Sequence, residues 1–129
     1  MPDLRPESPI RILVADDSPI FREALAGMLA AEAGFEVVAA VSGIEAALRN
    51  SRRLTPDIAI VDMRSPGDGT AAITRICTVS PETHVIVLSG YDDHALRSTA
   101  AAAGASAFLV KGVHPGVVAG TVRDVTRAA

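Results

Sequence analysis

Residues 12–41 read ILVADDSPIFREALAGMLAAEAGFEVVAAV, and this stretch decides the fold class. It opens on a continuous apolar run, as in a strand that is buried on both faces. Ser18 is a residue type that caps helices, and Pro19 follows at the first helical position, where its missing N–H costs nothing. Apolar residues then recur at helical spacing as far as Ala33, and Phe35–Val41 is rich in valine. The stretch therefore predicts a strand, a helix and a second strand parallel to the first.

The same alternation continues to the end of the chain. Strands are predicted at residues 10–15, 35–41, 57–61, 83–88 and 106–110, and helices at residues 18–33, 42–53, 70–79, 92–103 and 115–127. Ser42 and Glu45 form a capping-box pattern at the second helix, and Asp92 is the predicted cap of the fourth. This alternation predicts an α/β fold, a doubly wound five-stranded parallel sheet covered on both sides. We expect residues 1–9 to be a flexible tail and residues 10–129 to be one domain.

The composition fits one water-soluble domain. The chain has 129 residues, of which 49% are hydrophobic, and a formal net charge of −3. No basic cluster along the sequence exceeds the Arg52–Arg53 pair, which argues against a nucleic-acid surface. The single cysteine, Cys77, cannot form an internal disulfide, and no apolar run is long enough for a signal peptide or a membrane span. We therefore expect a cytoplasmic protein that does not contact membranes.

Polar side chains stand at the carboxyl ends of four of the five predicted strands. Asp16 and Asp17 follow the first strand, Asp62 follows the third, Ser89 the fourth and Lys111 the fifth. The carboxyl ends of parallel strands meet at one edge of the sheet, and ligands bind at that edge in open α/β folds. We therefore expect these five side chains to form one site.

This set of residues suits the transfer of a phosphoryl group to a carboxylate. Carboxylates at ~4 Å repel each other by about 1 kcal/mol per pair in water and ~4 kcal/mol at an effective dielectric constant of 20, so protons or a cation must neutralise the cluster. Carboxylates without histidine or cysteine favour Mg²⁺ or Mn²⁺. Asp62 is the best candidate nucleophile because the third strand should be central, with Ser89 as a hydrogen-bond donor and Lys111 as a counter-charge. In a plainer alternative, Asp16 and Asp17 only cap the first helix.

The segments ILVADD, IAIVDM, VIVLSG and ASAFLVKG carry a resemblance to a known family. They begin at residues 12, 58, 85 and 105, and they resemble the receiver domains of bacterial response regulators, most of all the NarL/LuxR type. The similarity covers about residues 10–127. It implies a flavodoxin-like (βα)5 fold with strand order 2-1-3-4-5, for which CheY is a standard example.

The resemblance implies a role for each acid at the sheet edge. Asp62 corresponds to the phosphorylated aspartate, and Asp17 and Asp62 correspond to the direct ligands of Mg²⁺. Asp16 corresponds to an acid that reaches the ion mainly through water, and the backbone carbonyl of Arg64 to the remaining protein ligand.

Other positions correspond to residues that sense the phosphoryl group. Ser89 and Lys111 match the hydroxyl and the lysine that contact it. Phe108 matches an aromatic switch residue that moves with the hydroxyl residue, although a plain core aromatic could stand at the same position. Arg64 and Tyr91 occupy positions that tune the lifetime of the phosphorylated state.

Two departures from the family pattern flank the acceptor. The loop from Asp62 to Gly69 is one residue shorter than usual, with Ser65 where an apolar residue is common. Gly112 replaces the proline that often follows the lysine. Both departures bear on loop geometry, kinase docking and phosphate lifetime rather than on the chemistry.

The resemblance also implies partners and an output. A sensor histidine kinase would phosphorylate the domain, which is a phospho-acceptor rather than an enzyme and acts only on its own phosphate. The expected switch surface is formed by the fourth helix, the fifth strand and the last helix, and a homodimer would form through that surface or through the first and last helices. Gly116 and Gly120 leave a flat strip on the last helix that favours such packing. Regulation of transcription would pass through an output domain, without direct nucleic-acid contact by this one.

Two alternatives remain open from the sequence. One is a stand-alone or phosphorylation-independent scaffold with the same fold. The other is an aspartyl-phosphate phosphohydrolase, whose usual Asp-x-Asp signature differs from the adjacent Asp16 and Asp17 found here.

Overall fold

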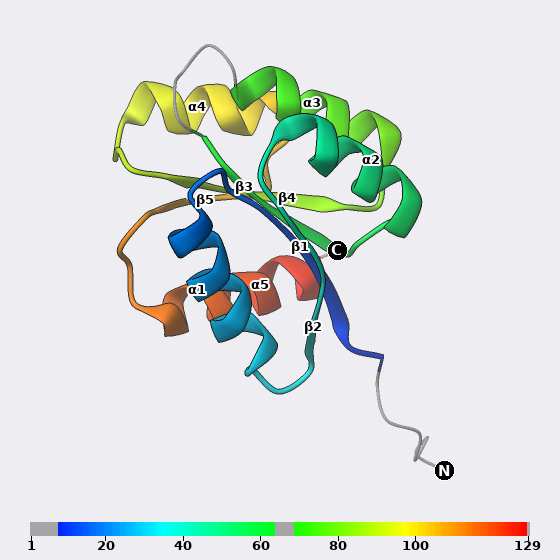
Figure 1. Ribbon diagram of the computed structural model, residues 1–129. Helices are drawn as coiled ribbons and strands as arrows, with labels where there is room; N and C mark the ends of the chain where they lie inside the picture. Colours follow the sequence, from blue (N-terminus) through cyan, green and yellow to red (C-terminus); the bar gives the residue numbers. More distant parts are fainter. Residues whose placement is uncertain (1–7, 64–68, 129) are drawn as a thin grey trace.

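The computed structural model describes residues 8–63 and 69–128, and these residues fold around a five-stranded parallel sheet (Figure 1). The strands are β1 (Ile10–Ala15), β2 (Phe35–Val41), β3 (Ile58–Asp62), β4 (His84–Ser89) and β5 (Ala107–Val110). The helices are α1 (Pro19–Ala30), α2 (Ile44–Leu54), α3 (Gly69–Val79), α4 (His94–Ala103) and α5 (Pro115–Ala128). The strand order is β2-β1-β3-β4-β5, which confirms the predicted fold and places β3 at the centre.

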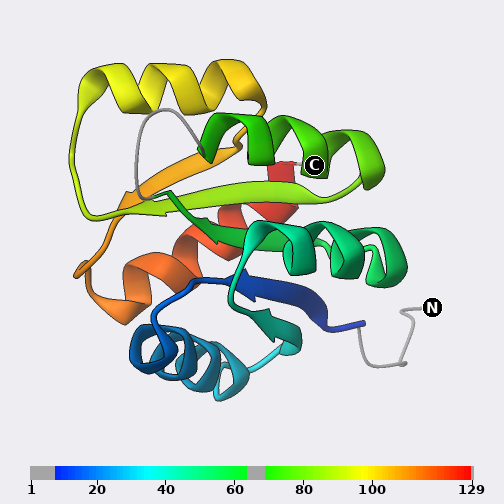
Figure 2. The same ribbon diagram turned by 45° about the horizontal axis from the view of Figure 1, so that its top comes forward.

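Helices cover both faces of the sheet, with α1 and α5 on one face and α2, α3 and α4 on the other (Figure 2). Alternation along the strands explains this arrangement, because successive side chains point to opposite faces. In β1, β3 and β4 the odd-numbered residues, such as Val61, pack in one core with Ile73 and Ile76 of α3. The even-numbered residues, such as Ile60, pack in a second core with Leu29 of α1. The sheet therefore separates two buried apolar layers.

Two of the predicted helix caps are wrong. Asp93, not Asp92, caps α4, and its Oδ1 accepts a hydrogen bond from the backbone N–H of Ala95 at 2.8 Å. The Ser42–Glu45 capping box does not form, because Gly43 occupies the N-cap of α2 and makes no side-chain cap hydrogen bond. Neighbouring residues with the same capping chemistry are hard to separate from sequence.

Helix α1 begins as predicted but ends earlier. Ser18 is its N-cap, and Pro19 its first residue. The helix stops at Ala30 instead of Ala33, and the chain then turns into β2 through Gly34. The other predicted boundaries agree within one or two residues. Most of the expected tail at residues 1–9 lies outside the described residues. None of the described helices is long and apolar enough to cross a lipid bilayer.

The carboxyl end of α4 is attached closely to α3. Gly104 follows α4 with φ +114°, and a Cβ atom at this position would lie 3.1 Å from Sγ of Cys77. Thr74 of α3 also donates a hydrogen bond from Oγ1 to the carbonyl of Ala103 at 3.3 Å. Burial raises the pKa of the Cys77 thiol.

Candidate functional site

The predicted polar residues do stand at one edge of the sheet. Asp16 directly follows β1, Asp62 is the last residue of β3, Ser89 is the last residue of β4, and Lys111 directly follows β5. The parallel register places Asp62 beside Leu88 and Ser89 beside Val110. Neighbouring parallel strands that end at the same level deliver their terminal side chains to a common place.

Lys111 joins the acids of two strands. Its Nζ lies 2.9 Å from Oδ2 of Asp16 and 3.0 Å from Oδ1 of Asp62. The side chain of Asp16 is only 2% exposed and that of Asp62 only 7%, so both ion pairs are largely shielded from water. Asp17 is exposed, and one of its carboxylate oxygens lies in the same cluster as those of Asp16 and Asp62. The site thus combines three carboxylates with one ammonium group.

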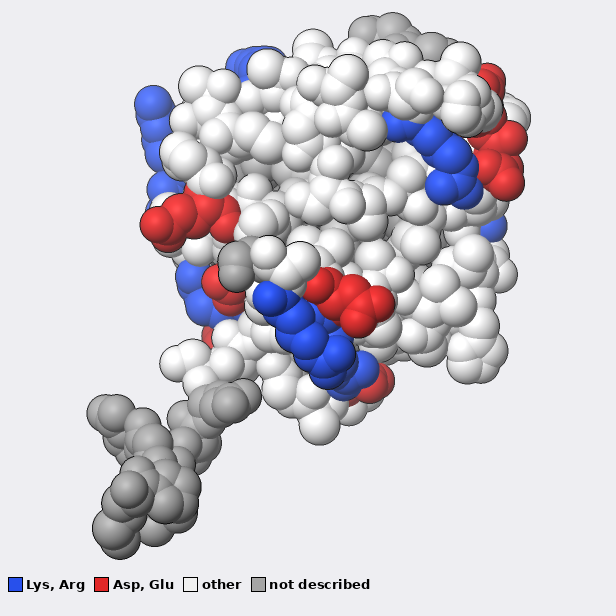
Figure 3. All heavy atoms as spheres, turned by 180° about the vertical axis from the view of Figure 1, so that it is seen from behind, with Lys and Arg blue, Asp and Glu red and all other residues white. Residues whose placement is uncertain are grey.

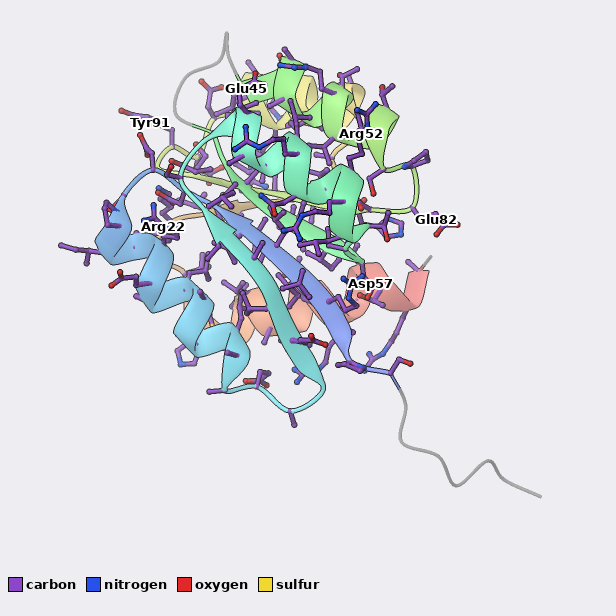
Figure 4. The ribbon with its side chains drawn as sticks, turned by 45° about the vertical axis from the view of Figure 1, so that its right-hand side comes forward. Arg22, Glu45, Arg52, Asp57, Glu82 and Tyr91 are labelled. Atoms are coloured by element: carbon purple, nitrogen blue, oxygen red, sulfur yellow. The ribbon has the colours of Figure 1, made fainter. Side chains whose placement is uncertain are left out.

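Residues at the start of α1 contact Asp16 and Lys111, and the sequence did not predict these contacts. Arg22 donates a hydrogen bond from Nη1 to the backbone carbonyl of Asp16 at 2.9 Å, and its label in Figure 4 marks this side chain on α1. The backbone N–H of Ser18 donates to Oδ1 of Asp16 at 2.9 Å. The ring of Phe21 lies beneath the ammonium of Lys111, with 4.5 Å from Nζ to the ring centroid, a cation–π contact.

Both partners of the Asp62–Lys111 pair hold their protons more tightly than usual. Burial raises the pKa of the Asp62 carboxyl above 3.8, and the charges of Asp16 and Asp17 add to this effect, while the hydrogen bond and charge of Lys111 oppose it. Burial alone would lower the pKa of Lys111, but its hydrogen bonds to Asp16 and Asp62 and their charges raise it above 10.5. Within the described part of the chain, one ammonium faces three carboxylates, so it offsets only part of their charge.

The three acids fit a small divalent cation. One carboxylate oxygen from each of Asp16, Asp17 and Asp62 lies within 4.8 Å of the others. Mg²⁺ takes oxygen ligands at about 2.0–2.1 Å in an octahedron, so oxygens on opposite sides of the ion are about 4.2 Å apart. Three carboxylate oxygens this close together can share one ion, directly or through its bound water. Arg64, whose carbonyl is the fourth expected ligand, lies outside the described residues.

The expected hydroxyl and switch residues lie next to this cluster. Ser89 is fully buried, and the backbone N–H of Lys111 donates to its carbonyl at 2.7 Å, so these two residues are neighbours at the sheet edge. The hydroxyl of Ser89 accepts a hydrogen bond from the backbone N–H of Tyr91 at 3.1 Å. Phe108 is half-buried on β5, and the guanidinium of Arg97 lies 4.7 Å from its ring centroid.

Of the two departures near the acceptor, one has a clear structural reason. Gly112 adopts φ +95° immediately after Lys111, in the left-handed region. Proline cannot adopt this conformation, because its ring fixes φ near −65°. The turn that positions Lys111 is therefore built for glycine. The loop at residues 65–68, including Ser65, lies outside the described residues.

Comparison with known proteins places most of the chain in one family. The model of the response regulator receiver domain family matches residues 12–123. The chain is 42% identical over 106 residues to protein-glutamate methylesterase/protein-glutamine glutaminase 2 of Anaeromyxobacter dehalogenans, and covers 31% of that protein. It is 32% identical over 117 residues to the transcriptional regulatory protein LnrK of Bacillus subtilis, and covers 53% of it.

A solved structure supports the match at the level of the fold. The signal receiver domain of NarL from Mycobacterium tuberculosis superposes with a TM-score of 0.88 and 29% sequence identity, over 95% of this chain and all of that one. The chain spans 31% of the methylesterase and 53% of LnrK, so it matches one part of each of these longer proteins.

Proposed function

Because this chain belongs to the response-regulator receiver family, we propose that it accepts a phosphoryl group on Asp62 from a sensor histidine kinase, with Mg²⁺ or Mn²⁺ bound. The observation that supports this most is the contact of Lys111 with both Asp16 and Asp62, at 2.9 and 3.0 Å, beside the exposed Asp17. An acidic cluster with one ammonium group can stabilise a transferring phosphoryl group once a divalent ion is added.

In this reaction an oxygen of the Asp62 carboxylate attacks phosphorus and forms an acyl phosphate. The bond from phosphorus to the donor, P–N in a phosphohistidine, breaks, and the leaving nitrogen keeps the electron pair and takes a proton. The bound ion would be held by Asp16, Asp17 and Asp62 and would offset charge on the phosphoryl oxygens. Lys111 is already within 3.0 Å of Asp62 and can pair with a phosphoryl oxygen with little movement.

The new phosphate would change the surroundings of Ser89 and Phe108. The hydroxyl of Ser89 accepts from Tyr91 and has its own hydrogen to donate to a phosphoryl oxygen. A shift of Ser89 would move the chain that leads into α4, and Phe108 lies against that helix through Arg97. We propose that the surface of α4, β5 and α5 is the one that switches. If Ser89→Ala left phosphorylation-dependent changes in α4 and α5 intact, this route would be wrong.

The output of the switch is a proposal that rests on the relatives. LnrK is described as a transcriptional regulatory protein, and we propose transcription as the process that this receiver controls through an output domain. The likeness to a methylesterase makes control of an attached enzyme the second candidate. We also propose homodimer formation through α5, where Gly116 and Val117 are exposed. Sedimentation that shows a monomer with and without a phosphate mimic would contradict the dimer.

Intact-mass analysis tests the phospho-acceptor directly. We expect incubation with acetyl phosphate and Mg²⁺ to add about 80 Da, in a form that acid or hydroxylamine removes. The addition should be absent with EDTA and absent from the Asp62→Asn variant. Asp57→Asn is a matched control, because Asp57 is exposed and its carboxylate accepts from the backbone N–H of Arg11, away from the site.

Two results would contradict the proposal. A mass increase that persists in Asp62→Asn would mean that another residue is the acceptor. Continuous hydrolysis of p-nitrophenyl phosphate without a stable adduct would favour the phosphohydrolase instead.

A further inference from the structure

Four arginines gather in a groove between α2 and α3. Arg49, Arg52 and Arg53 come from α2, and Arg75 comes from α3. The groove has a volume of about 760 Å³, and Figure 4 shows Arg52 on the side of α2 that faces α3. The sequence predicted no basic cluster larger than the Arg52–Arg53 pair. The fold enlarges that pair, because one helical turn adds Arg49 and the packing of α3 on α2 adds Arg75.

Three of these arginines have no acidic partner among the residues that the structure describes. Neither Arg49 nor Arg52 makes a hydrogen bond or an ion pair with any described residue. Arg53 donates only to the side-chain oxygen of Asn50, a neutral partner. On the opposite side of the molecule, by contrast, basic and acidic side chains lie next to one another (Figure 3). Positive charge is therefore concentrated in the groove although the whole chain is negative.

One carboxylate already binds in the groove. Glu45 of α2 pairs with Arg75 of α3 at 3.3 Å, and their side chains are 74% and 55% exposed. An ion pair this exposed contributes little to stability, so an incoming carboxylate can replace Glu45 at small cost. The pair shows how the groove would contact an acidic ligand.

The floor of the groove is apolar. Leu48 is 8% exposed and Val79 is half-buried, and both line the groove beneath the arginines. A ligand that matches both features carries acidic side chains on one side and apolar ones on the other. Guanidinium groups bind carboxylates with two parallel hydrogen bonds, which gives such a ligand orientation as well as charge attraction.

We infer that the groove between α2 and α3 binds an acidic amphipathic segment of a partner protein. A nucleic acid fits less well, because a long polyanion would also meet the net negative charge of the rest of the chain. The groove lies on helices α2 and α3, whereas Asp62 and Lys111 lie at the sheet edge. The inference therefore does not depend on phosphorylation.

The test uses the whole 129-residue chain and a defined probe. The probe is a fluorescein-labelled helical peptide with leucine on one face and glutamate on the other, and the comparison peptide has glutamine in place of glutamate. Fluorescence anisotropy at low salt gives the affinity, and backbone amide NMR shifts give the location. We expect saturable binding of the glutamate peptide, with shifts confined to α2 and α3.

Two double variants remove equal charge at different places. Arg49→Gln/Arg52→Gln should weaken binding at least about tenfold, because two charge-assisted contacts are lost. Arg123→Gln/Arg127→Gln, on α5, should change the affinity by less than about twofold, because long-range effects between exposed charges are screened. All four residues are helical, and glutamine is a good helix former, so both proteins should fold.

Several outcomes would overturn the inference. Equal losses in the two double variants would mean that only net charge matters. Equal binding of the glutamine peptide would mean that carboxylates are not recognised. Tighter binding of a 20-base-pair DNA duplex through Arg49 and Arg52 would assign the groove to nucleic acid instead.

Discussion

Replacing Lys111 by methionine removes the ammonium that joins Asp16 and Asp62 while keeping most of the side-chain stem. In a chelator, the unaltered protein has this ammonium within 3.0 Å of both carboxylates. The variant leaves the two carboxylates buried and facing each other without that counter-charge. We therefore expect Lys111→Met to destabilise the metal-free protein.

The distances set the size of the effect. Unit charges 3 Å apart attract by about 5–6 kcal/mol at an effective dielectric constant of 20, and truncating one partner of a buried pair costs about 3–5 kcal/mol in practice. The side chain of Lys111 is 25% exposed, so solvent screens part of this, and we expect a loss of about 2–3 kcal/mol. For a chain of this length the melting temperature should fall by about 8–12 °C.

Saturating magnesium should offset about half of the loss. The ammonium of Lys111 competes with a cation for the oxygens of Asp16 and Asp62, so its removal should tighten Mg²⁺ binding about tenfold. Tighter binding by that factor adds about 1.4 kcal/mol of stabilisation at saturating Mg²⁺. Thermal unfolding followed by circular dichroism, in EDTA and across a Mg²⁺ series, measures both effects on the same samples.

Arg123→Met is a matched control. Arg123 also forms an ion pair, at 2.8 Å to Glu32, and also lies over an aromatic ring, 4.8 Å from the centroid of Phe35. Its pair is more exposed and remote from the acids, so we expect a smaller loss that Mg²⁺ does not change. If Lys111→Met were as stable as the unaltered protein in EDTA, or bound Mg²⁺ less tightly, the electrostatic account of the site would be refuted.

Further predictions concern pH and the backbone. Because the folded pKa of Asp62 is raised above 3.8, the native state gains stability as pH falls from that raised value towards 3.8. In EDTA at pH 7, Asp62→Asn should therefore be more stable than the unaltered protein. Urea denaturation should show that the difference in the free energy of unfolding shrinks towards pH 4. A difference that does not change with pH would contradict this. Gly104→Ala should cost more than about 1 kcal/mol, because φ is +114° and the new Cβ would lie 3.1 Å from Cys77 Sγ. Gly27→Ala, in the middle of α1 with open space around it, should instead stabilise by about 0.5–1 kcal/mol, and equal effects of the two changes would refute the strain argument.

The sequence predicts the fold and the position of the acids because both follow from local patterns. Apolar runs identify the strands, and the carboxyl ends of parallel strands meet at one edge whatever the loops do. Asp16, Asp62 and Lys111 could therefore be placed together before any coordinates, and the structure does place them in contact.

The sequence does not predict contacts that depend on how helices pack. Nothing in the pattern around Phe21 and Arg22 shows that one lies under Lys111 and the other binds the carbonyl of Asp16. The cap of α4 was missed because Asp92 and Asp93 are the same residue type, and only the structure shows that Asp92 pairs with Arg97 at 2.8 Å while Asp93 caps the helix. The roles of Asp16, Asp62 and Lys111 in phosphorylation remain predictions.

The two ends of α4 are attached differently, and this difference has a mechanical consequence. Its carboxyl end is held to α3 at Gly104 and Ala103, whereas its amino end packs on the core through Leu96 and otherwise makes only the exposed contacts of Asp92 and Asp93. Helix α4 can therefore pivot about Gly104, at its carboxyl end. Its ten residues span about 15 Å, so a rotation of about 10° would carry the amino end some 2.5 Å, roughly half a helical turn. The end of the helix that would move most is the one next to Ser89.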